Sequence, residues 1–241
     1  MAKFMTKTVF TVGLLVMLMA VPAFGTSINK SIRIEAGSES EGASTVNGSI
    51  SIGEKAVVSG DVSTVNGAIR VDSGARIKSA STVNGALRIS DNVKSDGLDT
   101  VNGSVTVGES VTVDGAIEAV NGRITVEKGS KIASDVSNVN GQIELSGVQI
   151  GGNVSTVNGD IFVVDGSVIK GDLIVEKPGG WSWSNKMKRE PKVVIGPGSS
   201  VVGNIDLERK VKLFISESAQ VGGVTGVMTM DDAVRFSGER P

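Results

Sequence analysis

The chain of 241 residues contains no cysteine, no histidine and no tyrosine. Without cysteine it can form no disulfide, and it offers neither a thiol nucleophile nor a bacterial lipid-anchor site. Without histidine it lacks the side chain most often used as a general base. Aromatic residues make up only 3% of the chain, whereas glycine occurs 32 times. This composition is typical of a repetitive β-protein and not of an average globular enzyme.

The first 25 residues differ from everything that follows. Lys3 and Lys7 give a positive start, an apolar run extends from Val9 to Val21, and small residues surround Ala23-Phe24-Gly25. This pattern predicts a secretory signal peptide at 1–25, cleaved near Gly25, and export to the periplasm or the outer cell surface. The alternative is an uncleaved anchor, although the apolar run is short for a membrane span.

Loss of the signal peptide would remove two lysines and no acidic residue, so the formal charge would move from −2 to −4. Such a mildly acidic surface argues against nucleic acid as a partner. Because the chain has no cysteine, an exported fold would have to be stabilised by packing and hydrogen bonds alone.

One motif organises the rest of the chain. Ser44-Thr45-Val46-Asn47-Gly48 returns, intact or nearly so, with its asparagine at 47, 66, 84, 102, 121, 140 and 158, at intervals of 19, 18, 18, 19, 19 and 18 residues. A period this short predicts a solenoid of stacked coils, because one repeat alone could not enclose a core.

Apolar residues within each repeat are spaced as in β-strands. They come in pairs two residues apart, separated by steps of three or four residues that would turn a corner. In the first full repeat these positions are Val46, Ile50, Ile52, Ala56, Val58, Val62 and Val65, and in the fifth they include Ile124, Val126, Ile132, Val136 and Val139. We therefore expect an all-β, three-sided parallel β-solenoid of about ten coils, each of 18–19 residues.

The repeat sets the expected organisation of the chain. Solenoid coils fill 26–176, starting with a degenerate coil at Ile28-Asn29-Lys30, and the pattern is interrupted at 177–191. It resumes at 192–224 for the last coils, and 225–241 lose the period. We expect the final segment to be a cap or tail, since an incomplete cap would leave strand edges free for polymerisation.

The Asn-Gly pairs have a structural explanation. Glycine relaxes the backbone restriction at a corner, and asparagine tolerates left-handed conformations and can stack into an amide ladder. The expected corner ladder consists of Asn47, Gly48, Asn66, Gly67, Asn84, Gly85, Asn102, Gly103, Asn121, Gly122, Asn140, Gly141, Asn158 and Gly159. One alternative is an outward row of Asn and Thr that binds a ligand. Another is an ice-binding face built on the column Thr45, Thr64, Thr82, Thr100 and Thr156, which Ala119 and Asn138 interrupt.

The interruption at 177–191 contains both tryptophans of the chain and a group of basic residues. Exposed tryptophan beside clustered cations suits contact with an anionic glycan, lipid headgroups or a protein partner. The candidate contact residues are Trp181, Trp183, Lys186, Lys188 and Arg189. The alternative is a loop whose tryptophan rings fold back on the flank of the rod.

The sequence gives little support to catalysis. Acidic residues such as Asp61, Asp72 and Asp114 are scattered over columns that should face solvent, without a recurring carboxylate cluster for Ca²⁺ or general acid work. Gly196-Pro197-Gly198 is a corner that lacks the helix of a phosphate-binding loop. We expect a protein that is not an enzyme, with no catalytic, metal-binding or cofactor-binding residues.

Two resemblances bear on function. The segment from Val193 to Ile205, with echoes at Gly171-Asp172-Leu173, resembles the repeats of bactofilins, which are polymer-forming bacterial cytoskeletal proteins. Thr156-Val157-Asn158-Gly159-Asp160-Ile161 is similar to β-strand-repeat proteins of bacteria that are classed as adhesins. The first resemblance implies a right-handed β-helix that associates end to end without nucleotide and works as a scaffold near the membrane. Bactofilins are cytosolic, whereas this chain carries an export signal.

Taken together, these features predict a noncatalytic, exported structural or scaffold protein of the bacterial cell envelope that self-assembles end to end. The alternative is a surface adhesin or glycan-binding protein that uses the Trp-containing basic loop. The expected partners are further copies of the chain, cell-wall glycan or a membrane surface.

Overall fold

The computed structural model describes residues 26–178 and 189–241. The predicted signal peptide at 1–25 lies outside the described residues, as do Trp181, Trp183, Lys186 and Lys188 of the candidate contact site.

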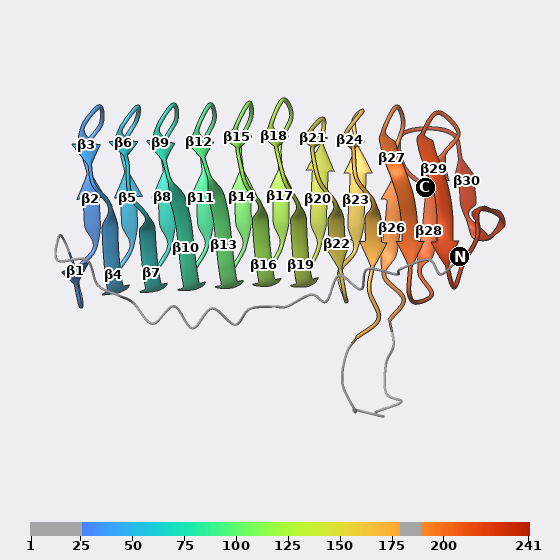
Figure 1. Ribbon diagram of the computed structural model, residues 1–241, viewed down its shortest axis with the longest axis horizontal. Coiled ribbons are helices and arrows are strands. Elements are labelled where there is room, and N and C mark those ends of the chain that lie inside the picture. The colour runs from blue at the N-terminus through green and yellow to red at the C-terminus, as the bar shows by residue number, and fades with distance from the viewer. Residues whose placement is uncertain (1–25, 179–188) are drawn as a thin grey trace, which may run out of the picture.

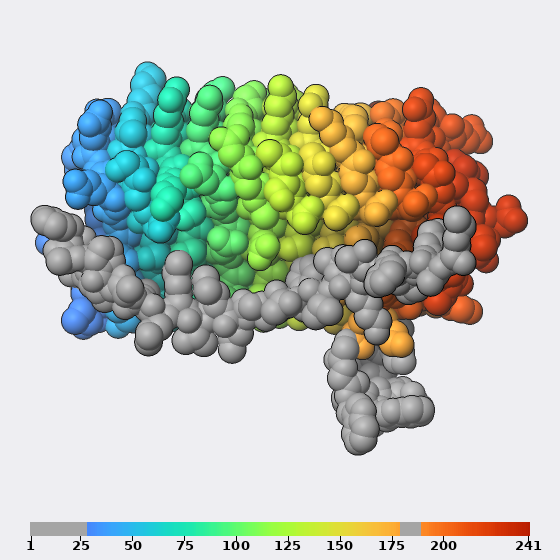
Figure 2. Space-filling model, in the orientation of Figure 1, coloured from blue at the N-terminus to red at the C-terminus, as the bar shows by residue number. Residues whose placement is uncertain are grey.

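The described residues form a parallel β-solenoid, in which short strands stack in rows along a rod (Figure 1). Every pairing between strands in these residues is parallel and joins strands one coil apart, giving about ten coils. The space-filling view shows the coils as successive bands that follow the order of the sequence along the rod (Figure 2). The three-sided parallel solenoid expected from the repeat is therefore confirmed as the fold.

Three rows of strands make up the three sides. The first row contains β1 (Thr26–Ser27), β4 (Ala43–Asn47), β7 (Val62–Asn66), β10 (Ser79–Asn84), β13 (Gly97–Asn102), β16 (Ile117–Asn121), β19 (Val136–Asn140), β22 (Val154–Thr156) and β25 (Leu173–Val175). The second row contains β2 (Ile32–Ile34), β5 (Ile50–Ile52), β8 (Ile69–Val71), β11 (Leu87–Ile89), β14 (Val105–Val107), β17 (Ile124–Val126), β20 (Ile143–Ser146), β23 (Ile161–Val164), β26 (Lys192–Ile195), β28 (Lys212–Ser216) and β30 (Val234–Phe236).

The third row contains β3 (Glu39–Ser40), β6 (Val57–Val58), β9 (Arg76–Ile77), β12 (Lys94–Ser95), β15 (Thr112–Val113), β18 (Lys131–Ile132), β21 (Gln149–Ile150) and β24 (Val168–Ile169). Two longer strands, β27 (Ser200–Leu207) and β29 (Gln220–Gly226), run from the third row into the first. Among the described residues the one helical element is the 3-10 turn η1 (Met230–Asp232) near the C-terminus.

The core is a continuous column of aliphatic side chains inside the rod. In the three-residue strands of the second row from β5 to β17, two residues point inward and one outward, as in β8, where Ile69 and Val71 are fully buried and Arg70 is exposed. The same position is filled in neighbouring coils by Ile50 and Leu87, which are also fully buried. Each such side chain contributes about 1.5–3 kcal/mol relative to leaving it in water.

One predicted core position is wrong. Val46, Val65 and Val139 were expected inside, yet all three are only half-buried and lie on the outer side of the first row. The preceding residue points inward instead, so that Thr45 is 1% exposed. Because side chains alternate along a strand, the two inward residues of β4 are Ala43 and Thr45. A polar side chain therefore occupies a position in the interior.

Residues with a left-handed backbone conformation also lie at a different corner from the Asn-Gly corner, where they were expected. Residues with positive φ occur at the corner between the second and third rows, for example Lys55 (φ 58), Gly74 (φ 73) and Asn92 (φ 58). In the described chain no asparagine of the Thr-Val-Asn-Gly motif has a positive φ, and among its glycines only Gly141 does (φ 133). The motif therefore has another physical basis.

Candidate functional site

The motif asparagines form a continuous amide ladder along one corner of the rod. In each rung the Nδ2 of one asparagine donates to the Oδ1 of the asparagine one coil earlier. The rungs are Asn47 to Asn29 (2.7 Å), Asn66 to Asn47 (2.8 Å), Asn84 to Asn66 (2.9 Å), Asn102 to Asn84 (3.0 Å), Asn121 to Asn102 (2.9 Å), Asn140 to Asn121 (2.8 Å) and Asn158 to Asn140 (3.0 Å). The amides thus satisfy one another, and the ladder includes Asn29 of the degenerate first coil.

The motif glycines are required by close stacking of the backbones. A Cβ on Gly103 would lie far inside contact distance of the carbonyl oxygen of Gly85, and the same clash recurs at Gly67, Gly85, Gly122, Gly141 and Gly159. Glycine is therefore needed because the neighbouring coil approaches its Cα, and an unusual φ adds to this requirement only at Gly141.

The motif threonines satisfy the corner backbone from inside. Thr64 Oγ1 donates to the carbonyl of Gly48 at 2.9 Å, Thr82 Oγ1 to Gly67 at 3.0 Å and Thr100 Oγ1 to Gly85 at 3.1 Å. These hydroxyls are buried, since Thr82 and Thr100 are each 4% exposed. The interpretation of this column as an outward ice-binding face is therefore wrong.

Arg209 closes the ladder at its C-terminal end. The coil after Asn158 has the 177–191 segment at this corner, so the next asparagine of the series is missing. Arg209 Nη1 reaches back to donate to Asn158 Oδ1 at 2.9 Å and to the carbonyl of Val157 at 3.1 Å, while Nη2 donates to the carbonyl of Arg189 at 3.2 Å. A guanidinium suits this position because it offers several donors in a fixed plane.

Both ends of the inserted segment are fixed by acidic side chains. Asp160 accepts hydrogen bonds from the Arg189 guanidinium and from the backbone N–H of Lys192 at 2.8 Å, and its side chain is only 13% exposed. At the other end, Glu208 Oε2 accepts from the backbone N–H of Lys177 at 3.1 Å. Desolvation, and secondly the Glu208 carboxylate, raises the pKa of Glu176. The root of the insertion is therefore a set of specific contacts between three coils.

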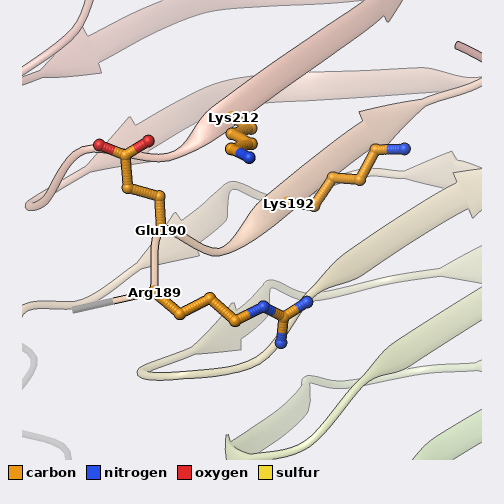
Figure 3. Close-up of a pocket in the computed structure, with 4 residues that line it drawn as sticks. All are labelled: Arg189, Glu190, Lys192 and Lys212. Atoms are coloured by element: carbon orange, nitrogen blue, oxygen red, sulfur yellow. The ribbon is translucent and has the colours of Figure 1, made fainter. Parts of the chain in front are cut away.

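A hollow of about 370 Å³ lies at this root, lined by Arg189, Glu190, Lys192 and Lys212. Lys192 and Lys212 are directly paired on β26 and β28, and the Glu190 carboxylate turns away from the Arg189 guanidinium (Figure 3).

The ammonium of Lys192 lies over two aromatic rings, 4.8 Å from the Phe214 centroid and 5.9 Å from the Phe162 centroid. Such cation–π contacts hold a lysine against an aromatic surface. Of the candidate contact residues, the structure places Arg189 at this hollow, where Lys192, which follows the insertion, and Lys212 join it.

A second corner ladder was also missed at the sequence level. Between the third and first rows, Asp135 Oδ1 accepts from the backbone N–H of Asn153 at 2.7 Å. Asn153 Oδ1 accepts from Asp172 N at 2.9 Å, and Asp172 Oδ1 from Asn204 N at 2.7 Å. The recurrence of Gly-Asn or Gly-Asp at 152–153, 171–172 and 203–204 is the signal that could have identified it.

Within residues 26–178 and 189–241, no group of three or more acidic side chains is placed to hold a metal ion. In the same ranges no helix is long and apolar enough to cross a membrane.

Comparisons with known proteins return no relative. A scan of protein-family models gives no match, and searches of the curated proteins and of the solved structures give none either. The resemblances to bactofilins and to adhesin-like repeats therefore rest on the repeat residues alone.

Proposed function

We propose that this protein is a noncatalytic, exported structural protein of the bacterial cell envelope whose rods associate through their ends. The observation that supports it is the regular parallel stack, in which the second row runs uninterrupted through eleven strands from β2 to β30. The stack extends by adding strands one coil apart, and a free strand edge is a template for another chain. A bactofilin-like relationship and a periplasmic or surface location form part of this proposal.

The test is the assembly state of the processed chain, residues 26–241, which contains every described strand. Light scattering over a concentration series, without nucleotide, should show a mass above that of the monomer that rises with concentration. A monomer at every concentration would exclude self-association as the function. Negative-stain microscopy would show whether the rods join through their ends or along their sides.

A second candidate function is binding of an anionic glycan at the insertion root. The supporting observation is the hollow, which gathers the cations of Arg189, Lys192 and Lys212 with the carboxylate of Glu190, and the position of Lys192 over the Phe162 and Phe214 rings. Cations can pair with carboxylate or phosphate groups of a glycan, and aromatic rings offer an apolar surface to its sugar rings.

Co-sedimentation with peptidoglycan or with an acidic polysaccharide tests this candidate. The double change Lys192→Gln and Lys212→Gln should reduce binding severalfold if the hollow is the site. The control is Lys94→Gln with Lys131→Gln, two exposed lysines in the third row far from the insertion. Equal loss in both variants would indicate unspecific attraction to charge.

A further inference from the structure

A pair of carboxylates stands on the outer side of the first row. Asp99 on β13 and Glu118 on β16 are exposed and directly opposite each other. The coils before and after them carry Ser81 and Ser137 at this position, so the charge is confined to two coils. Neither carboxylate forms an ion pair in the described part of the chain. Since like charges at directly opposite positions repel, this pair favours a cationic partner.

A matching pair of cations stands on the outer side of the second row. Arg70 on β8 and Arg88 on β11 are exposed and directly opposite each other, between Ser51 and Thr106. Neither guanidinium has an acidic partner among the residues that the structure describes. Each charged pair spans one coil, so both repeat their charge at the same spacing of about 4.8 Å along the rod. The two pairs are complementary in sign and in spacing.

The residues beside each charged pair are also complementary. Val101 and Val120 follow the carboxylates by two positions and are half-buried on the outer side of the first row. Ala68 and Ala86 precede the arginines by two positions and are half-buried on the outer side of the second row. Each row therefore presents a charged pair and, two residues closer to the Asn-Gly corner, an apolar pair.

The two rows can face each other only across two rods, because they are different sides of the same coils. When two rods stand side by side and point in the same direction, the strands on their facing sides run in opposite directions. The order carboxylate then valine on one rod therefore meets the order alanine then arginine in reverse. Carboxylates face arginines and valines face alanines. Rods that point in opposite directions would instead place the carboxylates against the alanines.

We propose that rods associate side by side in the same direction, with Asp99 and Glu118 of one copy paired to Arg70 and Arg88 of the next. This contact goes beyond the end-to-end association proposed above, because it uses the sides of the rod. The coil of β13 continues into β14, which lies two strands after β8 in the second row. Neighbouring rods are therefore staggered by two coils, or about 10 Å.

This stagger decides how the assembly grows. The contact joins two different surfaces, so each copy in it still offers one of them to a further neighbour. A displacement along the rod at every contact prevents closure into a ring, and the assembly is open.

Charge reversal on the processed chain, residues 26–241, tests the contact. Asp99→Arg with Glu118→Arg leaves cationic pairs on both rows, and Arg70→Glu with Arg88→Glu leaves anionic pairs on both rows. Each double variant alone should raise the dissociation constant of the side-by-side contact at least about tenfold. An equimolar mixture of the two should recover the association, because each variant supplies the charge that the other lacks. A misfolded variant would not recover in the mixture.

The matched control is Arg76→Glu with Lys94→Glu. These are exposed cations at directly opposite positions of the third row, and their reversal should leave the side-by-side contact unchanged. Sedimentation equilibrium measures the association, and negative-stain microscopy distinguishes contacts along the sides from contacts at the ends.

The outcomes separate this contact from the proposed end-to-end association. Rods that join only through their ends would overturn the side-by-side contact and leave the proposed function in place. Side-by-side rods with free ends would have the opposite meaning, and a monomer at every concentration would exclude both. If the reversed variants associate side by side as the unaltered protein does, or if their mixture shows no recovery, the charged pairs do not form the contact.

Discussion

The coils from β4 to β22 and the coils from β26 to β30 share one stack but are held at their corners by different chemistry. In the first group, glycine contacts glycine and asparagine donates to asparagine in each successive coil. In three of these coils a threonine, Thr64, Thr82 or Thr100, also donates to a glycine carbonyl. In the second group, Arg209 reaches back over the inserted segment, and Asp160 and Glu208 hold its two ends.

The difference shows what a repeated ladder requires. Each rung of the asparagine ladder uses the same residue as donor and acceptor, so it continues only while consecutive coils are alike. Where the 177–191 segment interrupts the series, charged side chains with longer reach make the contacts individually. Four predictions test this contrast, in order of expected effect.

The largest effect is expected from Gly103→Ala in the repetitive coils. The added Cβ would collide with the Gly85 carbonyl, so neighbouring coils would have to separate, at a cost of about 2–4 kcal/mol in the free energy of unfolding. Gly97→Ala is the matched control in the same coil, since its Cβ would be 3.8 Å from the nearest atom, the carbonyl oxygen of Ala116. Urea denaturation of both variants measures the difference, and similar stabilities would contradict the close-stacking explanation.

The next effect concerns the buried hydroxyls. Thr82→Val keeps the shape of the side chain but leaves the Gly67 carbonyl without its donor, and should cost about 1–3 kcal/mol. Val83→Thr, at a neighbouring residue that is 40% exposed, should change stability by less than about 0.5 kcal/mol. If both changes prove neutral in thermal unfolding, the hydroxyl does not stabilise the corner.

In the coils after the insertion, Arg209→Ala should cost about 1–2 kcal/mol, because it removes the hydrogen bonds to Asn158, Val157 and Arg189 together. Amide hydrogen exchange should accelerate at residues 189–193 and remain unchanged near Asn84. Arg209→Lys is the informative companion variant, since one ammonium cannot reproduce the planar set of donors. If Arg209→Lys kept the full stability of the unaltered protein, the positive charge alone, and not the planar set of donors, would stabilise this corner.

The smallest effect is a pH dependence. Desolvation, followed by the Glu118 carboxylate on the adjacent strand, raises the pKa of Asp99 from 3.8 to about 6. The folded chain then binds more protons than the unfolded chain between these values, so this group lowers stability as pH rises from about 4 to about 6. Asp99→Asn should therefore stabilise the protein at pH 7 and not at pH 4. The gain should be less than about 1 kcal/mol, because the carboxyl is only partly desolvated and solvent still reaches it from the outer side of the strand.

The same carboxyl offers a direct measurement by NMR titration. Glu118→Gln should lower the pKa of Asp99 but keep it above 3.8, since desolvation is the larger cause. A titration midpoint near 3.8 in the unaltered protein would contradict the assigned environment.

The fold was predictable because its two causes are local and repeated. Val and Ile at alternate positions define strands, and a period of 18 or 19 residues forces neighbouring coils into register, as for Ile69 with Leu87. The inward role of Thr82 was not predictable from hydrophobicity, because a threonine that donates to a buried carbonyl is as well placed inside as a valine. Arg209 was not predictable either, since its partners lie about 50 residues earlier in the chain.

The coil length, the strand positions and the recurrence of asparagine and glycine at one corner all follow from the linear pattern of residues. The contacts in three dimensions show that the glycines are needed where coils touch, that the threonines point inward, and that Arg209 closes the asparagine ladder. These properties depend on distances between residues of different coils, and a linear pattern specifies which residues recur but not which atoms meet across the stack.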